Sequence, residues 1–366
     1  MSNIHINSLN IETYRGIRNL KLEDFTGVNI LTGDNNCGKT SVLELLNTLI
    51  NPADVQMWQS LIRRPFEQKR NISYYEGFID LFYKGINEAP KIKYCIIDSE
   101  KNEHDIMLSY QIKQESVATS TVNKSSRIRF STDEKRIMAN RLYLTFDYDS
   151  KPVNTYKIYE FQDSLDYQQS VSIRPSFNKT IVYVSPTAHG KNVVFLNEIL
   201  NNSELYPEML KVLQDFDPDI ISINQYSSQV SSNEYCGILT KKFKNALPLN
   251  MYGDGMKKAI LLMSAVIVAK DGVLLIDEFE TAIHTSAMTK IYSWILKTCK
   301  RLNVQLFMTT HSKEALQKVL ALDSEPELKG DITLYTLYQK DGRNVARRLN
   351  AERAVEADEN FGLELR

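Results

Sequence analysis

The chain has 366 residues, of which 43% are hydrophobic and 24% charged, a composition typical of a globular protein. The net charge of −1 excludes a generally basic surface, so any contact with nucleic acid would have to be local. No apolar stretch approaches the ~20 residues of a membrane-spanning helix, and the N-terminus resembles no signal peptide. Four scattered cysteines without metal-binding spacing favour a reduced, cytoplasmic protein with no membrane contact.

The first elements lead into a glycine-rich loop. Residues 4–31 predict two short strands around the letters Y-R-G-I. The following letters G-D-N-N-C-G-K-T, from Gly33 to Thr40, match G-x-x-x-x-G-K-[ST] between an apolar strand pattern and a helical pattern. In that context, backbone N–H groups and the helix N-terminus cradle phosphates. We therefore expect Lys39 to reach the β- and γ-phosphates of a nucleotide and the Thr40 hydroxyl to take a magnesium site.

The middle of the chain has the pattern of a β-sheet. Short alternating runs at hairpin spacing predict antiparallel strands, and they cover Phe78–Tyr83, Lys91–Ile97, His104–Ile112, Arg141–Tyr148 and Asn154–Phe161. Among them lies a polar segment with basic flanks, Ser116–Ser131, which is rich in Ser and Thr. It fits a long flexible hairpin loop, and the alternative is a loop that contacts a trigger or nucleic acid.

The second half of the chain reads as alternating strands and helices. The expected order is a buried strand from Ile181, a helical region over residues 193–215, an apolar helix after the letters Y-G-D-G-M-K-K, an apolar strand from Val273, a helix near Ser286–Arg301, a strand ending at His311, then a helix, two strands and a short tail.

The strand from Val273 ends in adjacent carboxylates, V-L-L-I-D-E-F-E. Asp277 is expected to hold magnesium, directly or through water. Glu278 follows it at the place where a base for an attacking water is needed. An apolar strand that ends in acidic residues is common, so this motif gains its meaning from the phosphate loop far upstream.

Three later features add to the expected site. Gly253, Asp254 and Gly255 stand before an apolar helix, which makes a second N–H-rich cradle for an anion. His311 closes an apolar strand, and a histidine there can bond a γ-phosphate and orient the water. His284 follows the acidic pair, and both a structural and a catalytic role remain open for it.

This ordered motif set resembles the ATPase heads of the SMC/RecF/OLD branch of ABC-type ATPases. The form G-x-N-N-x-G-K-T is similar to the OLD group, and the whole chain looks like stand-alone bacterial "AAA family ATPase" proteins. Relatives of that kind are ATPase subunits of anti-phage systems: those of the phage anti-restriction induced system, of Septu and of retrons. The resemblance implies an α/β P-loop NTPase fold of ABC type. Its mixed, largely parallel core sheet would carry helices, an antiparallel β-subdomain and a helical signature subdomain.

The resemblance also implies one ATPase head over residues 1–366. Its expected subregions are N-terminal strands and phosphate loop over 1–52, the antiparallel β-subdomain over 76–162, the helical signature region over 190–270, and the acidic strand, switch histidine and C-terminal αβ part over 271–366. ATP and Mg²⁺ would bind in the seam of a head-to-head homodimer or a higher oligomer. The implied nucleotide-binding residues are Arg15, Gly33, Asn35, Asn36, Cys37, Gly38, Lys39, Thr40 and Ser41, with Gly253, Asp254 and Gly255 acting from the partner chain. Thr40 and Asp277 would bind the metal, and Lys39, Glu278 and His311 would carry hydrolysis.

Three departures from that pattern stand out. Asn250, Met251 and Tyr252 occupy the positions where a serine usually precedes the signature glycines. The glutamine loop has no diagnostic context, and Gln56 and Gln59 are its candidates. The sequence stops where OLD nucleases continue into a nuclease domain, so we expect no nuclease in this chain. It has no coiled-coil insertion either, which disfavours a chromosome-organising SMC.

The resemblance predicts a Mg-dependent ATPase that is the sensor or switch subunit of an anti-phage defence system and controls a separate effector protein. The alternative is a DNA repair or recombination ATPase of RecF/SMC type, for which nucleic acid would be the partner. A nucleotide-binding subunit of a membrane transporter is disfavoured because the form L-S-G-G-Q is absent.

Overall fold

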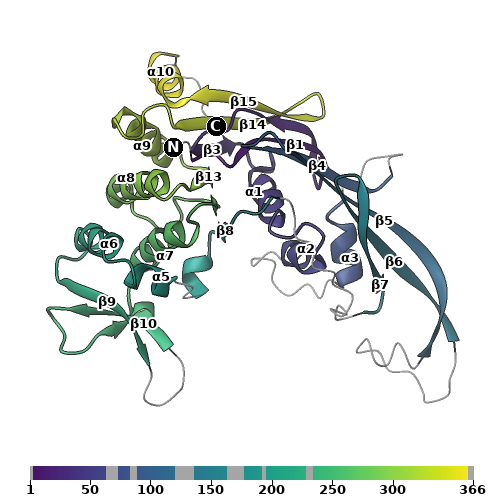
Figure 1. Cartoon of the computed structure of the whole chain (residues 1–366), viewed down its shortest axis with the longest axis horizontal. Coiled ribbons are helices and arrows are strands. Elements are labelled where there is room, and N and C mark those ends of the chain that lie inside the picture. The colour runs from purple at the N-terminus through teal and green to yellow at the C-terminus, as the bar shows by residue number, and fades with distance from the viewer. Residues whose placement is uncertain are drawn as a thin grey trace.

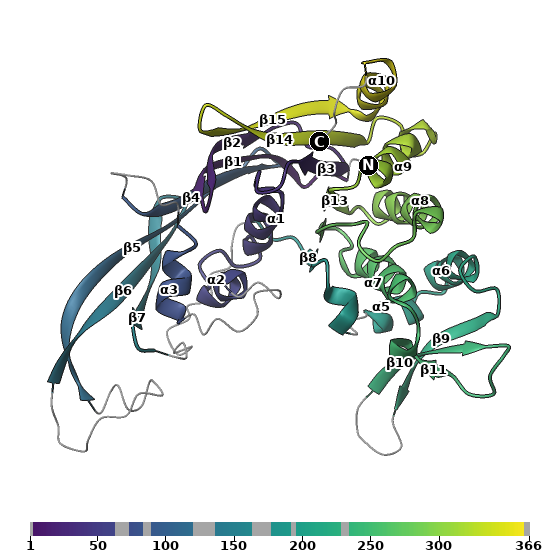
Figure 2. The same cartoon turned by 180° about the vertical axis from the view of Figure 1, so that it is seen from behind.

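The computed structural model describes residues 3–62, 73–82, 89–119, 136–162, 177–191, 195–227 and 234–361. The chain forms an arch with two arms that meet beneath a sheet at the top (Figures 1 and 2). One arm holds helices α1 to α3 and strands β4 to β7, and the other holds α5 to α8 and a small sheet. None of the helices among these residues is long and apolar enough to span a membrane.

A six-stranded core sheet joins the two arms, in the order β15-β14-β3-β13-β12-β8. Its strands are β3 (Val28–Gly33), β8 (Ile181–Val184), β12 (Val273–Ile276), β13 (Gln305–Thr309), β14 (Ile332–Lys340) and β15 (Arg343–Asn350). Only the β14–β15 pair is antiparallel. Strands β3, β12 and β13 are buried along their whole length, as expected of parallel strands covered on both faces.

Side chains of the core sheet alternate between two hydrophobic cores. In β12, Leu274 and Ile276 pack into the core of the helical arm, whereas Val273 and Leu275 pack into the core of the β-rich arm. The helical core is built by α5 (Leu196–Leu200), α6 (Leu205–Gln214), α7 (Asp254–Val268), α8 (Thr285–Arg301), α9 (Lys313–Leu320) and α10 (Ala351–Phe361). The core sheet therefore separates the two hydrophobic cores and contributes one face to each of them.

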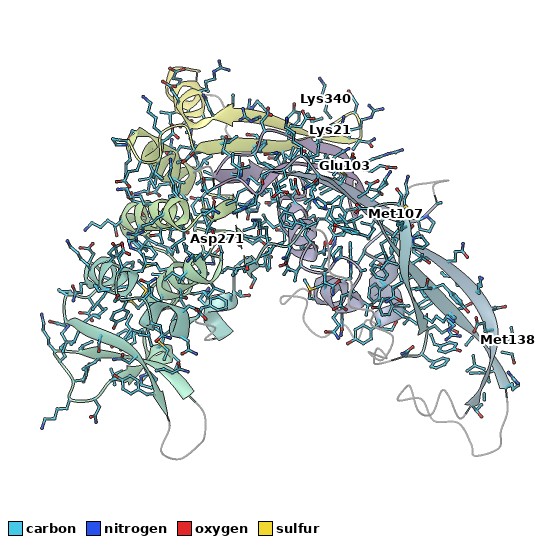
Figure 3. All side chains as sticks on the ribbon, in the orientation of Figure 1. Lys21, Glu103, Met107, Met138, Asp271 and Lys340 are labelled. Carbon is cyan, nitrogen blue, oxygen red and sulfur yellow. The ribbon has the colours of Figure 1, made fainter. Side chains whose placement is uncertain are left out.

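The antiparallel sheet confirms most of the alternating runs of the sequence. Its order is β2-β1-β4-β5-β6-β7, with β1 (Ile6–Tyr14), β2 (Ile17–Leu22), β4 (Lys91–Asp98), β5 (Glu103–Ala118), β6 (Arg136–Tyr148) and β7 (Lys151–Tyr159). It packs on α1 (Lys39–Thr48), α2 (Val55–Ile62) and α3 (Tyr74–Ile79). Strands β5 and β6 extend beyond the helices, and Met138, 60% exposed, lies near their far end (Figure 3).

The strand predicted over Phe78–Tyr83 is wrong: its first residues end helix α3. Ser73 caps this helix, since its side chain accepts a bond from the N–H of Glu76, and the Glu76 side chain reaches back to it. This S-x-x-E pairing is a helix-start signal, and it overrides the alternating pattern downstream.

Two other predicted segments need correction. The helical region over 193–215 is two helices, α5 and α6, and the Asn202 side chain accepts from the N–H of Leu205 at 2.9 Å where the second begins. The expected short tail contains helix α10. In addition, the signature region includes a small sheet that the sequence pattern did not predict, formed by β9 (Ile220–Ser227), β10 (Glu234–Thr240) and β11 (Leu247–Pro248). Most of the polar segment Ser116–Ser131 lies outside the described residues.

Candidate nucleotide site

The phosphate loop joins β3 to α1, as the sequence predicts. Gly33 has φ +131° and Gly38, the N-cap of α1, has φ +104°. A Cβ atom on Gly33 would lie 2.1 Å from the carbonyl oxygen of Leu337 in β14. Both the backbone angle and the neighbouring strand therefore require glycine at position 33.

Lys39 curls back over this loop. Its Nζ donates to the carbonyl oxygens of Gly33 at 2.7 Å and Asp34 at 2.8 Å. The side chain is 4% exposed. The carbonyl groups of the loop thus hold the Lys39 ammonium beside the predicted phosphate-binding loop. The backbone therefore fixes the position of this positive charge.

A cavity of about 490 Å³ opens at the loop. It is lined by Arg15, Gly16, Ile17, Asn35, Asn36, Gly38, Lys39, Thr40, Ser41 and His311. Its volume lies within the usual range of ligand pockets. Most of the predicted nucleotide residues therefore share one cavity, but Gly33 and Cys37 are buried beneath it and Gly253, Asp254 and Gly255 do not line it.

Arg15 enters this cavity from the turn between β1 and β2. Its φ of 50° is left-handed. The guanidinium is anchored: Nη2 donates to the Leu61 carbonyl at 2.7 Å, and Nε lies 3.6 Å from the buried carboxylate of Glu44 in α1. Arg15 thus lies beside the phosphate loop, and contacts with α1 and α2 hold its side chain.

Asp277 joins the phosphate loop to the core sheet. The Thr40 hydroxyl donates to its Oδ1 at 3.2 Å, and the Thr309 hydroxyl donates to the same oxygen at 2.6 Å. Asp277 is 3% exposed. These hydroxyl and carboxylate oxygens fit Mg²⁺, which binds proteins through one or two carboxylates and leaves its other positions to water and phosphate. No group of three His, Cys, Asp or Glu side chains able to hold a metal occurs in the described part of the chain.

Glu278 sits in a strained turn directly after β12. Its φ is 47°, an unusual angle for a residue other than glycine, and such strain clusters at functional sites. Its N–H donates to the Thr309 hydroxyl at 2.7 Å, and its carboxylate accepts from Thr281 at 3.3 Å. Thr309 therefore holds both members of the acidic pair.

The two histidines have different surroundings. His311 lines the cavity, and its backbone N–H donates to Glu280 Oε1 at 2.8 Å. His284 is the N-cap of α8 and bonds Ser286 at 2.8 Å, which is a structural use of the ring. Neither Gln56 nor Gln59 lines the cavity.

The signature loop lies at the N-terminus of α7. Gly253 is the N-cap, and the Asp254 carboxylate, 63% exposed, bonds Lys257 at 2.9 Å. A Cβ atom on Gly255 would lie 3.1 Å from the carbonyl oxygen of Ala282. The loop thus abuts the backbone that follows the acidic pair, and its residues do not line the cavity of their own chain.

The sequence motifs single out neither Thr309 nor Glu280 as a residue of the site. Thr309 meets Asp277 because β12 and β13 are neighbouring parallel strands with Ile276 opposite Met308. The signal that could have found this pair is the presence of polar residues at the ends of two buried strands. That signal needs the strand order, which a single sequence does not provide.

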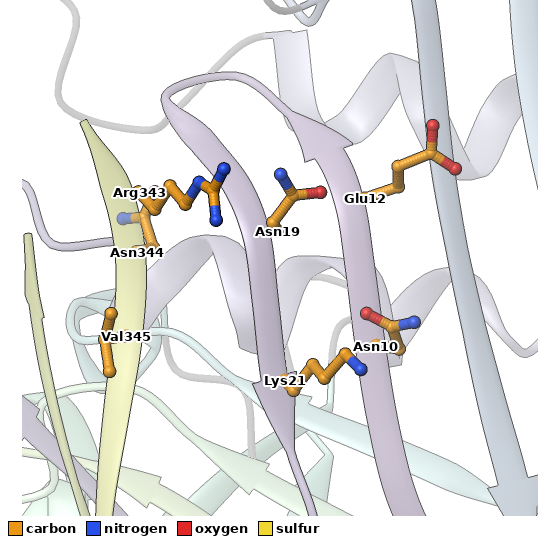
Figure 4. Close-up of a pocket in the computed structure, with 7 residues that line it drawn as sticks. All are labelled: Asn10, Glu12, Asn19, Lys21, Arg343, Asn344 and Val345. Carbon is orange, nitrogen blue, oxygen red and sulfur yellow. The ribbon is translucent and has the colours of Figure 1, made fainter. Parts of the chain in front are cut away.

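A second hollow of about 480 Å³ lies on the outer face of β1, β2 and β15 (Figure 4). It is lined by Asn10, Glu12, Asn19, Lys21, Arg343, Asn344 and Val345. Asn344 reaches from this hollow to the phosphate loop: its amide donates to the Cys37 carbonyl at 3.2 Å, and its oxygen accepts from the Arg18 N–H at 3.0 Å.

We expect Asn344→Ala to loosen the phosphate loop from outside the cavity. The change leaves the buried Cys37 carbonyl and the Arg18 N–H without these partners, which costs about 1–3 kcal/mol of folding free energy. The midpoint of thermal unfolding should fall, and titration with a fluorescent nucleotide should show weaker binding. Asn10→Ala, an exposed residue of the same hollow, is the control. Unchanged unfolding and binding in Asn344→Ala would contradict the expected coupling.

The fold and this cavity define a P-loop nucleotide-binding protein with an SMC-head-like architecture. The chain belongs to the family described as "AAA domain, putative AbiEii toxin, Type IV TA system", whose model matches residues 28–316.

Among known proteins, the chain is similar to an ATP/GTP phosphatase of Helicobacter pylori, with 23% identity over 97% of this chain and 99% of the relative. It also matches the endonuclease GajA of Bacillus cereus with 22% identity over 78% of this chain, and the match spans 52% of that protein. The crystal structure of an SMC head bound to the C-winged helix domain of ScpA has a TM-score of 0.51 at 12% identity, covering 96% of this chain and 99% of that one. This likeness shows the fold.

Proposed function

We propose that this protein is a cytoplasmic, Mg-dependent ATPase that closes head to head around ATP and acts as the switch subunit of a bacterial anti-phage defence system, controlling a separate effector. The observation that carries the ATPase proposal is a chain of hydrogen bonds that starts at the cavity lined by Lys39 and Thr40. Thr40 bonds Asp277, and Thr309 bonds both Asp277 and Glu278. The relative named ATP/GTP phosphatase supports this activity.

Each residue has a distinct task in this proposal. Lys39 and the N–H groups of the phosphate loop bind the β- and γ-phosphates. Thr40 and Asp277 hold Mg²⁺, which when bound neutralises phosphate charge. Glu278 accepts the proton of the attacking water, and His311 bonds the γ-phosphate and orients that water.

Closure of two heads accounts for the signature loop. Gly253, Asp254 and Gly255 do not line the cavity of their own chain, and the position of a Cβ on Gly253 meets no atom within 4 Å. A loop that is open on its outer side can receive the nucleotide of a partner chain. The complete site would then take the phosphate loop from one chain and the signature loop from the other.

The effector proposal rests on similarity. The family description names a toxin of a Type IV TA system, and the match to GajA spans about half of that endonuclease. The motif set also resembles anti-phage ATPase subunits. A chain that hydrolyses ATP and acts through a second protein fits all three.

A DNA repair ATPase is the second candidate, and the outer hollow favours it. Lys21 and Arg343 lie there with the amides of Asn10 and Asn19 (Figure 4). Glu12, the acid of this hollow, is paired with Lys91 and Lys93, so cationic groups are left to face a phosphodiester backbone.

One set of assays tests these proposals. The purified chain should hydrolyse ATP with Mg²⁺ and should lose that activity with a chelator. In cells, toxicity that needs a neighbouring gene would support the effector proposal. DNA-stimulated hydrolysis that falls steeply with salt would favour repair, since phosphate contacts release counterions. Absence of Mg-dependent hydrolysis in the folded protein would refute the ATPase proposal.

A further inference from the structure

A lysine lies buried beneath the signature loop. Lys258 in α7 is 0% exposed and is among the largest fully buried side chains of the described residues. Lysine is almost never buried without a partner, because its ammonium loses hydration. Its Nζ donates one long hydrogen bond, 3.5 Å, to the Pro186 carbonyl, its only hydrogen-bond partner in the described part of the chain.

The surroundings of this ammonium are acidic. The ammonium bonds Pro186, which follows β8, and the backbone N–H of Asp277 bonds Val184 at the end of the same strand at 3.0 Å. Burial lowers the pKa of Lys258 to about 8, and the carboxylates of Asp277, Glu280 and Glu278 oppose this effect. The ammonium therefore lies within electrostatic reach of the residues assigned to metal binding and hydrolysis.

Glu280 is the carboxylate with an unused oxygen. Its Oε1 accepts from the backbone N–H of His311, whereas its Oε2 is buried without a hydrogen-bond partner. Lys258 likewise has donor capacity left, since an ammonium carries three N–H groups. A buried ammonium with unused donor capacity thus lies in the field of a carboxylate whose second oxygen has no hydrogen-bond partner.

The signature loop contacts the same acidic segment. Gly255 abuts the carbonyl of Ala282, and Lys258 follows Gly255 by three residues, which places both on one face of α7. Gly255 on this face of α7 therefore contacts the backbone after Glu278, and Lys258 on the same face lies within electrostatic reach of the carboxylates of that segment.

We propose that Lys258 is a positioning residue. Its charge holds the Glu280 carboxylate in place, and Glu280 in turn holds the backbone of His311 in its position relative to Glu278. The proposal rests on the function proposed above. The loop at the start of α7 would contact the nucleotide of the partner chain, whereas Lys258 in the next turn would position the carboxylates of its own chain. Lys258 therefore makes hydrolysis in one site depend on the position of the helix that serves the other.

Lys258→Met tests this role, because methionine keeps the length of the stem and removes the charge. Replacing a buried charge by an apolar side chain is often neutral for stability, so the unfolding midpoint should be unchanged or higher. Nucleotide affinity should stay within about twofold, whereas kcat should fall by about 10–100-fold, as for other groups that orient catalytic side chains. Lys270→Met, an exposed lysine just past α7, is the control. If Lys258→Met does not fold, Lys258→Gln takes its place.

A double-mutant cycle tests the route through Glu280. Glu280→Gln keeps the shape of the side chain and should reduce kcat without weakening nucleotide binding. Residues that act as a unit give non-additive losses, so the variant with both changes should be no slower than the slower single variant.

The outcomes separate this proposal from the proposed function. An unmodified chain without ATPase activity would remove both. A normal kcat in Lys258→Met would overturn this inference alone, as would a parallel loss of stability, affinity and kcat, which marks a structural role. Additive losses in the cycle would overturn the action of Lys258 through Glu280.

Discussion

Lys39→Ala is expected to abolish ATP turnover and to weaken nucleotide binding. The ammonium is held 2.7 Å from the Gly33 carbonyl and 2.8 Å from that of Asp34, at the base of the cavity. Its removal takes away the positive charge assigned to the β- and γ-phosphates. Loss of one such preorganised donor costs about 10²–10³-fold in rate, and the change in affinity adds to it.

Phosphate release and fluorescent-nucleotide titration measure the two effects separately. Lys270→Ala is the matched control, because Lys270 is exposed and lies outside the cavity lining. A Lys39→Ala protein with normal hydrolysis would show that the phosphate-loop assignment is wrong.

Glu278→Gln is expected to trap ATP and lock two chains together. The change removes the base but keeps the hydrogen bond from Thr281 within reach, and it relieves a negative charge near the γ-phosphate. Hydrolysis should fall by about 10²–10⁴-fold, the usual contribution of a general base. ATP that binds only the closed state then stabilises that state by mass action.

Light scattering with and without Mg-ATP measures closure. Gly253→Arg in the Glu278→Gln background should block it and leave ATP binding intact, because its Cβ points into open space within one chain. Gly255→Arg should also block closure, although its side chain meets Ala282 as well. A monomer under all conditions would refute the dimer seam.

The phosphate loop could be predicted because its chemistry is local. Gly33 to Thr40 are contiguous, so spacing and flanking patterns suffice to place Lys39 and Thr40 at one cavity. The same holds for the adjacent acids after β12. Helices α7 and α8 and strand β13 were predicted for the same reason, because the apolar pattern of each is contiguous in the sequence.

The remaining parts of the site depend on tertiary pairing. Thr309 lies beside Asp277 only because β13 is the neighbour of β12. Lys258 reads in the sequence as one of two ordinary lysines after a glycine loop, and only burial distinguishes it from Lys257. The strand wrongly predicted at Phe78 shows the opposite case, where a local cap outweighed alternation.

The core sheet between the two hydrophobic cores also fixes the relative positions of the residues in the candidate site. Leu306 and Met308 face the helical core, and Phe307 between them faces the other. A slip of β13 by one residue would exchange these faces, bury each side chain in the wrong core and move the Thr309 hydroxyl away from Asp277. The hydrophobic alternation of one five-residue strand thus determines where the Thr309 hydroxyl lies relative to the Asp277 carboxylate. A single-residue deletion in this strand would therefore destabilise the fold as well as displace the site.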